Sequence, residues 1–202
     1  MDYLWNLLQK NYCIFYDFET TGLNQFHDDI IEYAFAYDNQ EISSLINTKK
    51  EIIQKIEKIT GISQEMVKNA PPLCDEMTKI LDFINQKYGN KFFIAHNNDG
   101  FDKLFLNRIL QTYGYTKYIY QWKHIDTLLL AKKLLPQLPS YNLKSLLIYF
   151  KIKSKNLHRA NEDTKFLKLV YYELCKLLAE KKNIDKEKVI SDPYIVYNYL
   201  YN

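Results

Sequence analysis

The order of apolar and polar segments along the chain predicts an α/β fold, with a central mixed five-stranded sheet flanked by helices. Two observations lead to this prediction. Short apolar runs of strand length alternate with longer segments in which apolar residues recur every three or four positions. The first three strand-like runs follow one another closely, as in an antiparallel meander. The last two are each preceded by a helical segment, as in parallel crossovers.

The N-terminal half contains the three strands of the predicted meander. The first is an almost unbroken apolar run, and the next two are separated only by a turn at Asp38 and Asn39. A later segment has Pro near its start, apolar residues at helical spacing and Gly89 at its end, which is typical of a helix. We expect strands at residues 12–18, 29–37 and 41–48, and helices near 50–58 and at 70–89.

The C-terminal half supplies two further strands and their crossover helices. Residues 91–96 are short and mostly apolar, as in a buried strand, and 123–135 begins with a strand pattern that turns helical before Pro136. We expect further helices at 99–114, near 142–149 and at about 159–181. The last stretch is expected to pack back on the body as a short helix through Tyr194, Ile195, Tyr197, Tyr199 and Leu200.

The bulk composition predicts a single globular domain over residues 1–202. Of these residues, 47% are hydrophobic and 25% are charged, and Gly and Pro number only 5 each. The motifs described below occupy a core of about 12–175, followed by a C-terminal extension at 182–202. The net charge of +3 is mild and only Arg108 and Arg159 are arginines, so we expect contacts with nucleic acid mainly through its backbone and by stacking.

Cysteine usage and hydropathy indicate the cellular compartment. The three cysteines are odd in number, widely spaced and free of any CxxC pair, which argues against a disulfide framework or a zinc site. No segment approaches the roughly 18 apolar residues of a membrane span. We therefore expect an intracellular, cytoplasmic protein with no membrane partner.

Two acids, Asp17 and Glu19, stand at the end of the first predicted strand. Side chains two positions apart on a strand point the same way, so both carboxylates share one face. Two carboxylates placed close together at a buried strand end repel each other and lose hydration, which raises their pKa values unless a cation compensates. Oxygen ligands without a neighbouring His or Cys suit Mg²⁺ or Mn²⁺. Because such a pair is common, the prediction of a metal site depends on further acids elsewhere.

Two more acids and a histidine lie where further ligands and a base would be needed. Asp102 is near the start of a helix that follows the strand at 91–96, at the edge where open α/β sheets place their sites. Asp163 is near the start of the last long helix, five positions after His158. Taken singly, each acid is also explained as a helix-start carboxylate favoured by the helix dipole. His158, with a pKa near neutrality, could accept a proton from water.

Three motifs connect these residues. They are "FYDFETTGL" with Asp17 and Glu19, "IAHNNDGFDKLFL" with Asp102, and "HRANEDTKFL" with His158 and Asp163. In order and spacing they resemble the motifs of the DnaQ-like 3′-to-5′ exonucleases of the DEDDh group, within the ribonuclease H-like superfamily. The resemblance covers most of the chain, and all five catalytic positions hold the expected residue types.

The resemblance implies a metal-dependent exonuclease that releases nucleoside 5′-monophosphates. Two divalent cations, Mg²⁺ or Mn²⁺, would clamp the scissile phosphate. Asp17 would bridge both ions, and Glu19 and Asp163 would complete the ion that activates water. Asp102 would hold the second ion, partly through water. His158 would be the general base.

The resemblance also suggests residues that contact the terminal nucleotide. The backbone at Phe18 and Thr20 and the side chain of Thr21 resemble the family's grip on the 3′ hydroxyl. Leu23 and Ile62 resemble the apolar residues that flank the last base. Ordinary core packing explains Leu23 and Ile62 equally well.

Four residues around the second motif match the motifs of this family less closely. Phe101 would add to the base pocket or pack in the core, and Asn97 would orient the site or cap the next helix. Asp99 is expected to cap that helix rather than to bind metal. Asp126 is expected to support the fold near the second motif.

The motifs do not determine the polymer. We expect nucleic acid with a free 3′ end, single-stranded or frayed, with DNA slightly favoured for proofreading or repair. A polymerase acting in trans is a candidate partner. An exoribonuclease that trims RNA 3′ ends is the main alternative, distinguished by the 2′ hydroxyl. A catalytically silent nucleic-acid-binding module is the third reading.

Overall fold

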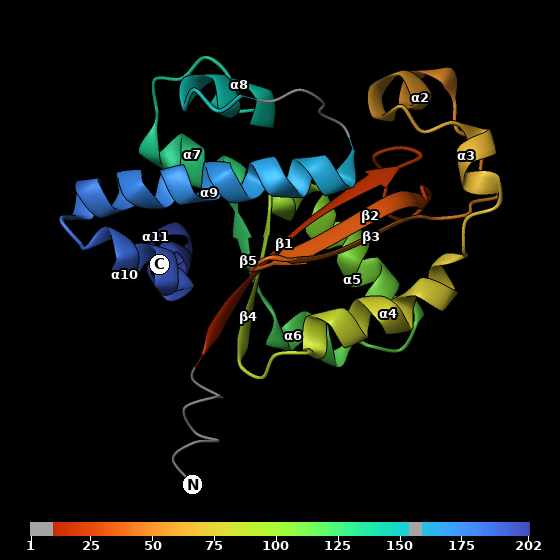
Figure 1. Ribbon diagram of the computed structural model, residues 1–202, viewed down its shortest axis with the longest axis horizontal. Coiled ribbons are helices and arrows are strands. Elements are labelled where there is room, and N and C mark those ends of the chain that lie inside the picture. The colour runs from red at the N-terminus through yellow and green to blue at the C-terminus, as the bar shows by residue number, and fades with distance from the viewer. Residues whose placement is uncertain (1–9, 154–158) are drawn as a thin grey trace, which may run out of the picture.

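The computed structural model describes residues 10–153 and 159–202, and Figure 1 shows a central sheet with helices on both of its faces. The order across the sheet is β3-β2-β1-β4-β5. The pairs β3–β2 and β2–β1 are antiparallel, whereas β1–β4 and β4–β5 are parallel. The predicted mixed five-stranded α/β sheet is therefore confirmed. Its strands are β1 (Asn11–Thr20), β2 (Ile30–Tyr37), β3 (Gln40–Leu45), β4 (Asn90–Ala95) and β5 (Lys123–Asp126).

The helices occupy the connections between strands and the C-terminal third. The helix predicted at 99–114 is divided, because Phe101 has a φ of −146° and a ψ of −79°, which no helix accommodates. Two helices of five residues each were not predicted, since so short a segment shows no apolar repeat. The helices are α2 (Gln54–Thr60), α3 (Gln64–Lys68), α4 (Leu73–Asn85), the 3₁₀ turn η1 (Asn98–Gly100), α5 (Asp102–Thr112), α6 (Lys117–Gln121), α7 (Thr127–Leu134), α8 (Leu143–Tyr149), α9 (Ala160–Lys182), α10 (Lys186–Ser191) and α11 (Pro193–Tyr201).

The sheet separates two apolar cores. On one face α4, α5 and α6 cover an aromatic cluster that includes Tyr16 and Phe18. On the other face α9 runs across the sheet and, with α7, α8, α10 and α11, covers Phe15. Because successive side chains of a strand point to opposite faces, Asp17 and Glu19 lie on the same face as Phe15, the face that α9 covers.

The C-terminal helices complete the second core. Val196 and Leu200 of α11 are buried, and the ring of Tyr194 packs edge-on against Phe92 at 4.8 Å between centroids. Lys133 of α7 donates hydrogen bonds to the last carbonyls of α11, at Tyr199 (3.1 Å) and Leu200 (2.7 Å). The expected packing of the tyrosine-rich end on the body is confirmed.

The turn that leaves β4 is fixed by a fully buried side chain, Asn98. Its amide nitrogen donates to the carbonyls of Phe93 and Ile125, both at 3.0 Å, and its oxygen accepts from the Tyr16 hydroxyl at 2.5 Å. One side chain thereby joins β1, β4 and β5. The start of α5, and with it Asp102, is held at the C-terminal edge of the sheet.

An acidic side chain, Asp126, also supports this turn. The buried carboxylate of Asp126 accepts from the backbone N–H groups of Asn97 and Asp99, both at 3.1 Å. It also caps α7 by accepting from Leu128 at 2.8 Å. The expected supporting role of Asp126 near the second motif is confirmed. The expectation that Asp99 caps the following helix is wrong, because Asp99 makes no capping bond to α5 and pairs instead with Lys103 at 2.9 Å.

Helix lengths and cysteines bear on the remaining expectations. Across residues 10–153 and 159–202, no helix is long and apolar enough to cross a membrane. All three cysteines are free thiols, with Cys74 exposed and Cys175 buried.

Candidate active site

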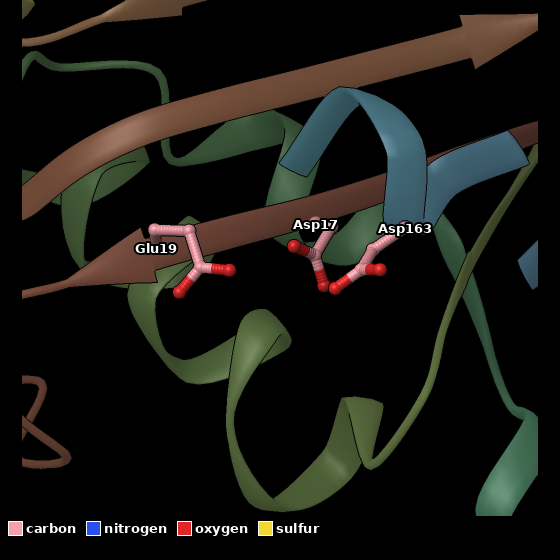
Figure 2. Close-up of side chains that lie close together, drawn as sticks. All are labelled: Asp17, Glu19 and Asp163. Carbon is pink, nitrogen blue, oxygen red and sulfur yellow. The ribbon is translucent and has the colours of Figure 1, made fainter. Parts of the chain in front are cut away.

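Three carboxylates from two distant parts of the chain meet at the end of β1. Asp17 and Glu19 come from β1, and Asp163 comes from the first turn of α9. One oxygen of each carboxylate lies within 4.8 Å of the others. Figure 2 shows the three side chains close together at the end of β1. Asp163 is only 9% exposed. The structure therefore brings together three of the predicted ligands on the α9 face of the sheet.

The fourth predicted ligand, Asp102, approaches from the opposite layer. The ladder between β1 and β4 ends at the pair Phe15 and Ile94, so β1 continues beyond its parallel neighbour. Past this point the carboxylate of Asp102 accepts a hydrogen bond from the backbone N–H of Phe18 at 3.1 Å. The Asp102 side chain thus accepts a hydrogen bond from a backbone N–H of β1 that has no partner in β4. Asp102 lies outside the three-carboxylate group, although its charge acts on Asp17.

Burial and mutual repulsion shape the protonation of these acids. Burial raises the pKa of Asp17 well above its ordinary value, and the negative charges of Asp102, Glu19 and Asp163 raise it further. Burial likewise raises the pKa of Glu19 to about 8, with further contributions from Asp163 and Glu32. The pKa of Asp102 is raised by burial and lowered in part by the Phe18 amide. Without a cation, the fold concentrates negative charge that it cannot solvate.

This donor set fits a divalent cation. All candidate ligand atoms are carboxylate oxygens, and the three side chains come from a rigid strand and the first turn of a long helix. Hard oxygen donors of this kind suit Mg²⁺ or Mn²⁺. A cation among Asp17, Glu19 and Asp163 would offset the repulsion and burial that raise the pKa values of Asp17 and Glu19.

An ion pair that was not predicted holds the start of α9 in place. Glu32 of β2 is 4% exposed and stands opposite Glu19 in the β1–β2 ladder. Both oxygens of its carboxylate accept from the guanidinium of Arg159: Oε1 from Nη2 at 2.7 Å and from Nε at 3.1 Å, and Oε2 from Nε at 3.2 Å. It also accepts from the backbone N–H of Ala160, the first residue of α9, at 2.9 Å.

The Glu32–Arg159 pair affects both the position of Asp163 and the pKa of Glu19. Bidentate contacts between a guanidinium and a carboxylate fix orientation as well as distance. Asp163 lies one helical turn beyond the residues so anchored, so Glu32 and Arg159 set where its carboxylate meets Asp17 and Glu19. The positive charge of Arg159 also lowers the pKa of Glu19, against the larger raising effect of burial.

The residues predicted to hold a 3′ hydroxyl are engaged within the chain. The N–H of Phe18 donates to Asp102. The Thr20 hydroxyl donates to the carbonyl of Gly22, and the Thr21 hydroxyl accepts from the N–H of Asp29 at 3.0 Å. The Phe18 amide is therefore not free for substrate. The predicted contacts of Thr20 and Thr21 stay predictions.

The residues predicted to contact a base differ in exposure. Leu23 is 83% exposed, so core packing does not explain it. Ile62 is fully buried in a small cluster with Ile31 and Val67, where its side chain cannot reach a base. Phe101 is partly buried, with its ring 5.0 Å from that of Phe105. Asn97 is exposed in a left-handed conformation and makes no side-chain capping bond. His158 lies outside the described residues.

Sequence reasoning missed three residues that organise the site. Glu32, Arg159 and Asn98 contact no expected substrate, and each works through a partner distant in the chain. A weak signal existed for two of them, because Arg159 and Asn98 stand inside the quoted third and second motifs. For Glu32, a charged residue inside an otherwise apolar strand was the available signal.

Comparison with known proteins gives a family match over most of the chain. A family of exonucleases, RNase_T, matches residues 14–171. The DNA polymerase III PolC-type of Caldanaerobacter subterraneus is 32% identical over 172 residues, covering 83% of this chain. The PolC-type polymerase of Bacillus subtilis is 30% identical over 184 residues, covering 87% of this chain. The chain spans about 12% of the length of either polymerase.

Solved structures with the same fold include exonuclease I of Escherichia coli. Its zinc-bound complex with single-stranded DNA superposes with a TM-score of 0.71 at 19% identity, covering 87% of this chain and 42% of that one. An exonuclease I from Methylocaldum szegediense gives a TM-score of 0.66 at 18% identity, covering 85% of this chain and 41% of that one. These likenesses support the mixed-sheet fold described above.

The raised pKa values predict how stability depends on pH in metal-free protein. Burial raises the pKa of Glu19 from its ordinary 4.5 to about 8 in the folded state, so the folded state binds more protons than the unfolded state between these values. The free energy of unfolding should therefore fall as pH rises from about 4 to about 8. The pKa of Asp17 is raised as well, so Asp17 adds to this decline. Asp17→Asn should therefore flatten it and stabilise metal-free protein at pH 8 by about 0.5–2 kcal/mol, as single stabilising substitutions do.

Thermal unfolding in EDTA and in Mn²⁺ checks this expectation. Mn²⁺ should raise the Tm of the wild type and leave Asp17→Asn nearly unchanged. Asp82→Asn, a change of the same kind at an exposed position of α4, should behave as the wild type. Equal pH profiles for Asp17→Asn and the wild type would contradict the crowding of charge described here.

The ion pair predicts a loss of metal affinity when either partner is changed. Glu32→Gln should weaken Mn²⁺ binding about tenfold, as for other groups that orient metal ligands. Arg159→Lys keeps the charge but loses the bidentate contact, so an intermediate loss is expected. Calorimetric titration with Mn²⁺ measures both. Lys165→Gln, which removes only surface ion pairs of α9, is the matched control. Unchanged affinity in a folded Glu32→Gln variant would rule out the positioning role.

Proposed function

Because this chain belongs to the RNase_T exonuclease family, we propose that it is a metal-dependent 3′-to-5′ exonuclease releasing nucleoside 5′-monophosphates. The observation that carries this proposal is the meeting of Asp17, Glu19 and Asp163 within 4.8 Å at the end of β1. Membership in the family and the geometry of the acids support the same chemistry. The fold that carries them is ribonuclease H-like.

Exonucleases of this family use divalent metals, and the group of Asp17, Glu19 and Asp163 supports such a site in this chain. Asp17, Glu19 and Asp163 would hold one ion, and Asp102 with Asp17 would hold the second, as Mg²⁺ or Mn²⁺. When bound, such ions lower the pKa of the attacking water and neutralise charge on the phosphate. The chain contributes the fixed positions of the four carboxylates, because β1, α5 and α9 are packed in one body.

Two further roles are proposed from the motifs. His158 would accept the proton of the attacking water, since a histidine changes charge in the range where the reaction would run. Leu23, exposed just beyond β1, would contact the terminal base. The backbone of Thr20 would meet the 3′ end, and the side chain of Thr21 would do so only by exchanging its present hydrogen bond with the N–H of Asp29.

DNA is the favoured polymer. The curated relatives are named as DNA polymerases, and the Escherichia coli neighbour was solved with single-stranded DNA. These names support a single-stranded or frayed DNA 3′ end as substrate, and a polymerase as a partner. Degradation of RNA, and binding without cleavage, remain as outcomes of the experiment below.

A panel of labelled substrates tests the proposal. Single-stranded DNA, mismatched duplex DNA and RNA, each labelled at the 5′ end, are incubated with Mg²⁺ or Mn²⁺. We expect shortening from the 3′ end, lost in EDTA and reduced at least 10³-fold in Asp17→Ala, because removal of a bridging ligand disables both ions. The control Asp82→Ala should cleave normally. An intact label on every substrate would refute the enzymatic proposal, and binding that persists in EDTA would then favour the silent module.

The role of His158 predicts a pH dependence. With metal saturating, kcat should rise with pH through the histidine range near about 6.5 and level off above it, because only neutral imidazole accepts a proton. His158→Ala should lower kcat and remove this rise. Saturating metal separates the effect from protonation of the carboxylates. A rise that persists in His158→Ala would assign the proton transfer to another group.

A further inference from the structure

The loop between β1 and β2, residues 21–29, carries two large apolar side chains in solvent. Leu23 is 83% exposed and Phe26 is 75% exposed. Within residues 10–153 and 159–202, Phe26 is the one phenylalanine among the exposed large apolar side chains. The loop follows Glu19 and Thr20 directly and returns to Ile30, which pairs with Thr20, so the loop adjoins the end of β1 that carries Glu19.

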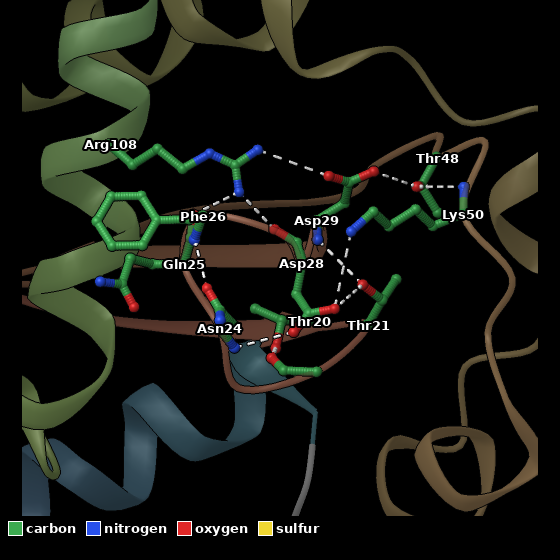
Figure 3. Close-up of polar contacts among 11 residues, drawn as sticks. Thr20, Thr21, Asn24, Gln25, Phe26, Asp28, Asp29, Thr48, Lys50 and Arg108 are labelled. Carbon is green, nitrogen blue, oxygen red and sulfur yellow. Dashed lines mark hydrogen bonds and ion pairs between the residues drawn. The ribbon is translucent and has the colours of Figure 1, made fainter.

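The loop is held from α5, the helix that begins at Asp102. The guanidinium of Arg108 donates to the loop carbonyls of Gln25 at 2.6 Å and Asp28 at 2.5 Å, as Figure 3 shows. Both of these bonds come from Nη1, and Nη2 lies 3.6 Å from the carboxylate of Asp29. One side chain therefore fixes three points of the loop relative to the helix that carries a predicted metal ligand.

Hydrogen bonds among the residues of the loop also fix its shape. The carboxylate of Asp28 accepts from the N–H of Asn24 at 2.9 Å, and the side-chain oxygen of Asn24 accepts from the N–H of Phe26 at 2.9 Å. The Thr21 hydroxyl bridges Asp28 and Asp29. The backbone that presents Phe26 is thus tied by hydrogen bonds on both sides, and Figure 3 shows these contacts as one network.

The exposure of Phe26 has a cost that the rest of the loop does not relieve. Burying a phenylalanine side chain is worth roughly 1.5–3 kcal/mol. A flexible loop could fold such a side chain against the body, but the network around Arg108 keeps it out. An aromatic ring presented from a fixed backbone, next to a site for nucleic acid, provides a face on which an unpaired base can stack.

We propose that Phe26 is a stacking platform for an unpaired base of the substrate strand, upstream of the terminal nucleotide. This inference rests on the proposed exonuclease function and adds a specificity element to the same site. Bases within a duplex already have both faces covered, so the platform favours single-stranded or frayed 3′ ends. Arg108 is the residue that positions it.

Kinetics with two substrates test the platform. One substrate is a 5′-labelled single-stranded oligonucleotide of about 16 residues, in the polymer that the wild type degrades, a length matching the largest ssDNA site sizes. The other is the p-nitrophenyl ester of thymidine 5′-monophosphate, which has no second base. Phe26→Ala should raise KM for the oligonucleotide about 5- to 100-fold, as expected for one lost stacking contact. The increase for the ester should be at least fivefold smaller.

Further variants separate stacking from other causes. Phe26→Tyr should restore the KM of the wild type, whereas Phe26→Leu, which stays apolar but lacks a ring, should not. Tyr120→Ala removes an aromatic ring that is 88% exposed on α6 and should leave both substrates unaffected. Arg108→Gln should raise KM for the oligonucleotide, and its effect should not add to that of Phe26→Ala, since both act on one contact.

The outcomes are distinguishable. Failure of the wild type on both substrates overturns the proposed function. A wild type active on both, with Phe26→Ala unchanged on the oligonucleotide, overturns the platform alone. Equal losses on the ester and the oligonucleotide would place Phe26 at the terminal nucleotide and overturn the upstream position. Full activity of Phe26→Leu would replace stacking by simple apolar contact.

Discussion

The close approach of Asp17, Glu19 and Asp163 is the constraint on which the rest of this structure depends. Three carboxylates share a small, largely buried volume, and the pKa values of Asp17 and Glu19 are raised as a result. Such a cluster opposes folding unless other parts of the chain hold it and a cation neutralises it. The arrangement is therefore favourable for binding metal and unfavourable for the metal-free fold, a trade that functional sites commonly show.

The two layers of helices meet this constraint from opposite sides. On one side the Glu32–Arg159 pair fastens the start of α9, which places Asp163 and brings one positive charge near Glu19. On the other side β4 stops short, and α5 begins where Asp102 can take the Phe18 amide. Residues of both layers thus reach the same edge of the sheet at the end of β1.

The loop that follows β1 extends the same organisation outward. Arg108 belongs to the helix that Asp102 begins, so one helix joins the edge that carries Asp102 to the loop that carries Phe26. The match to the RNase_T family covers the parts of β1, α5 and α9 that carry these carboxylates, and the polymerase relatives contain a similar segment as about an eighth of their length. The Arg108 network holds the loop that follows β1, and this loop presents Phe26 to solvent.

The sequence alone determined what depends on local pattern. Alternation along β1 placed Asp17 and Glu19 on one face, helical spacing located α4 and α9, and the order of three motifs indicated the family. Tertiary packing decided the rest. It brought Glu32 to Arg159, buried Asn98 among three strands, enclosed Ile62 and left Phe26 in solvent. Periodicity reports only how a segment meets its neighbours along the chain. Contacts between distant segments, and the exposure of single side chains, depend on how the layers pack.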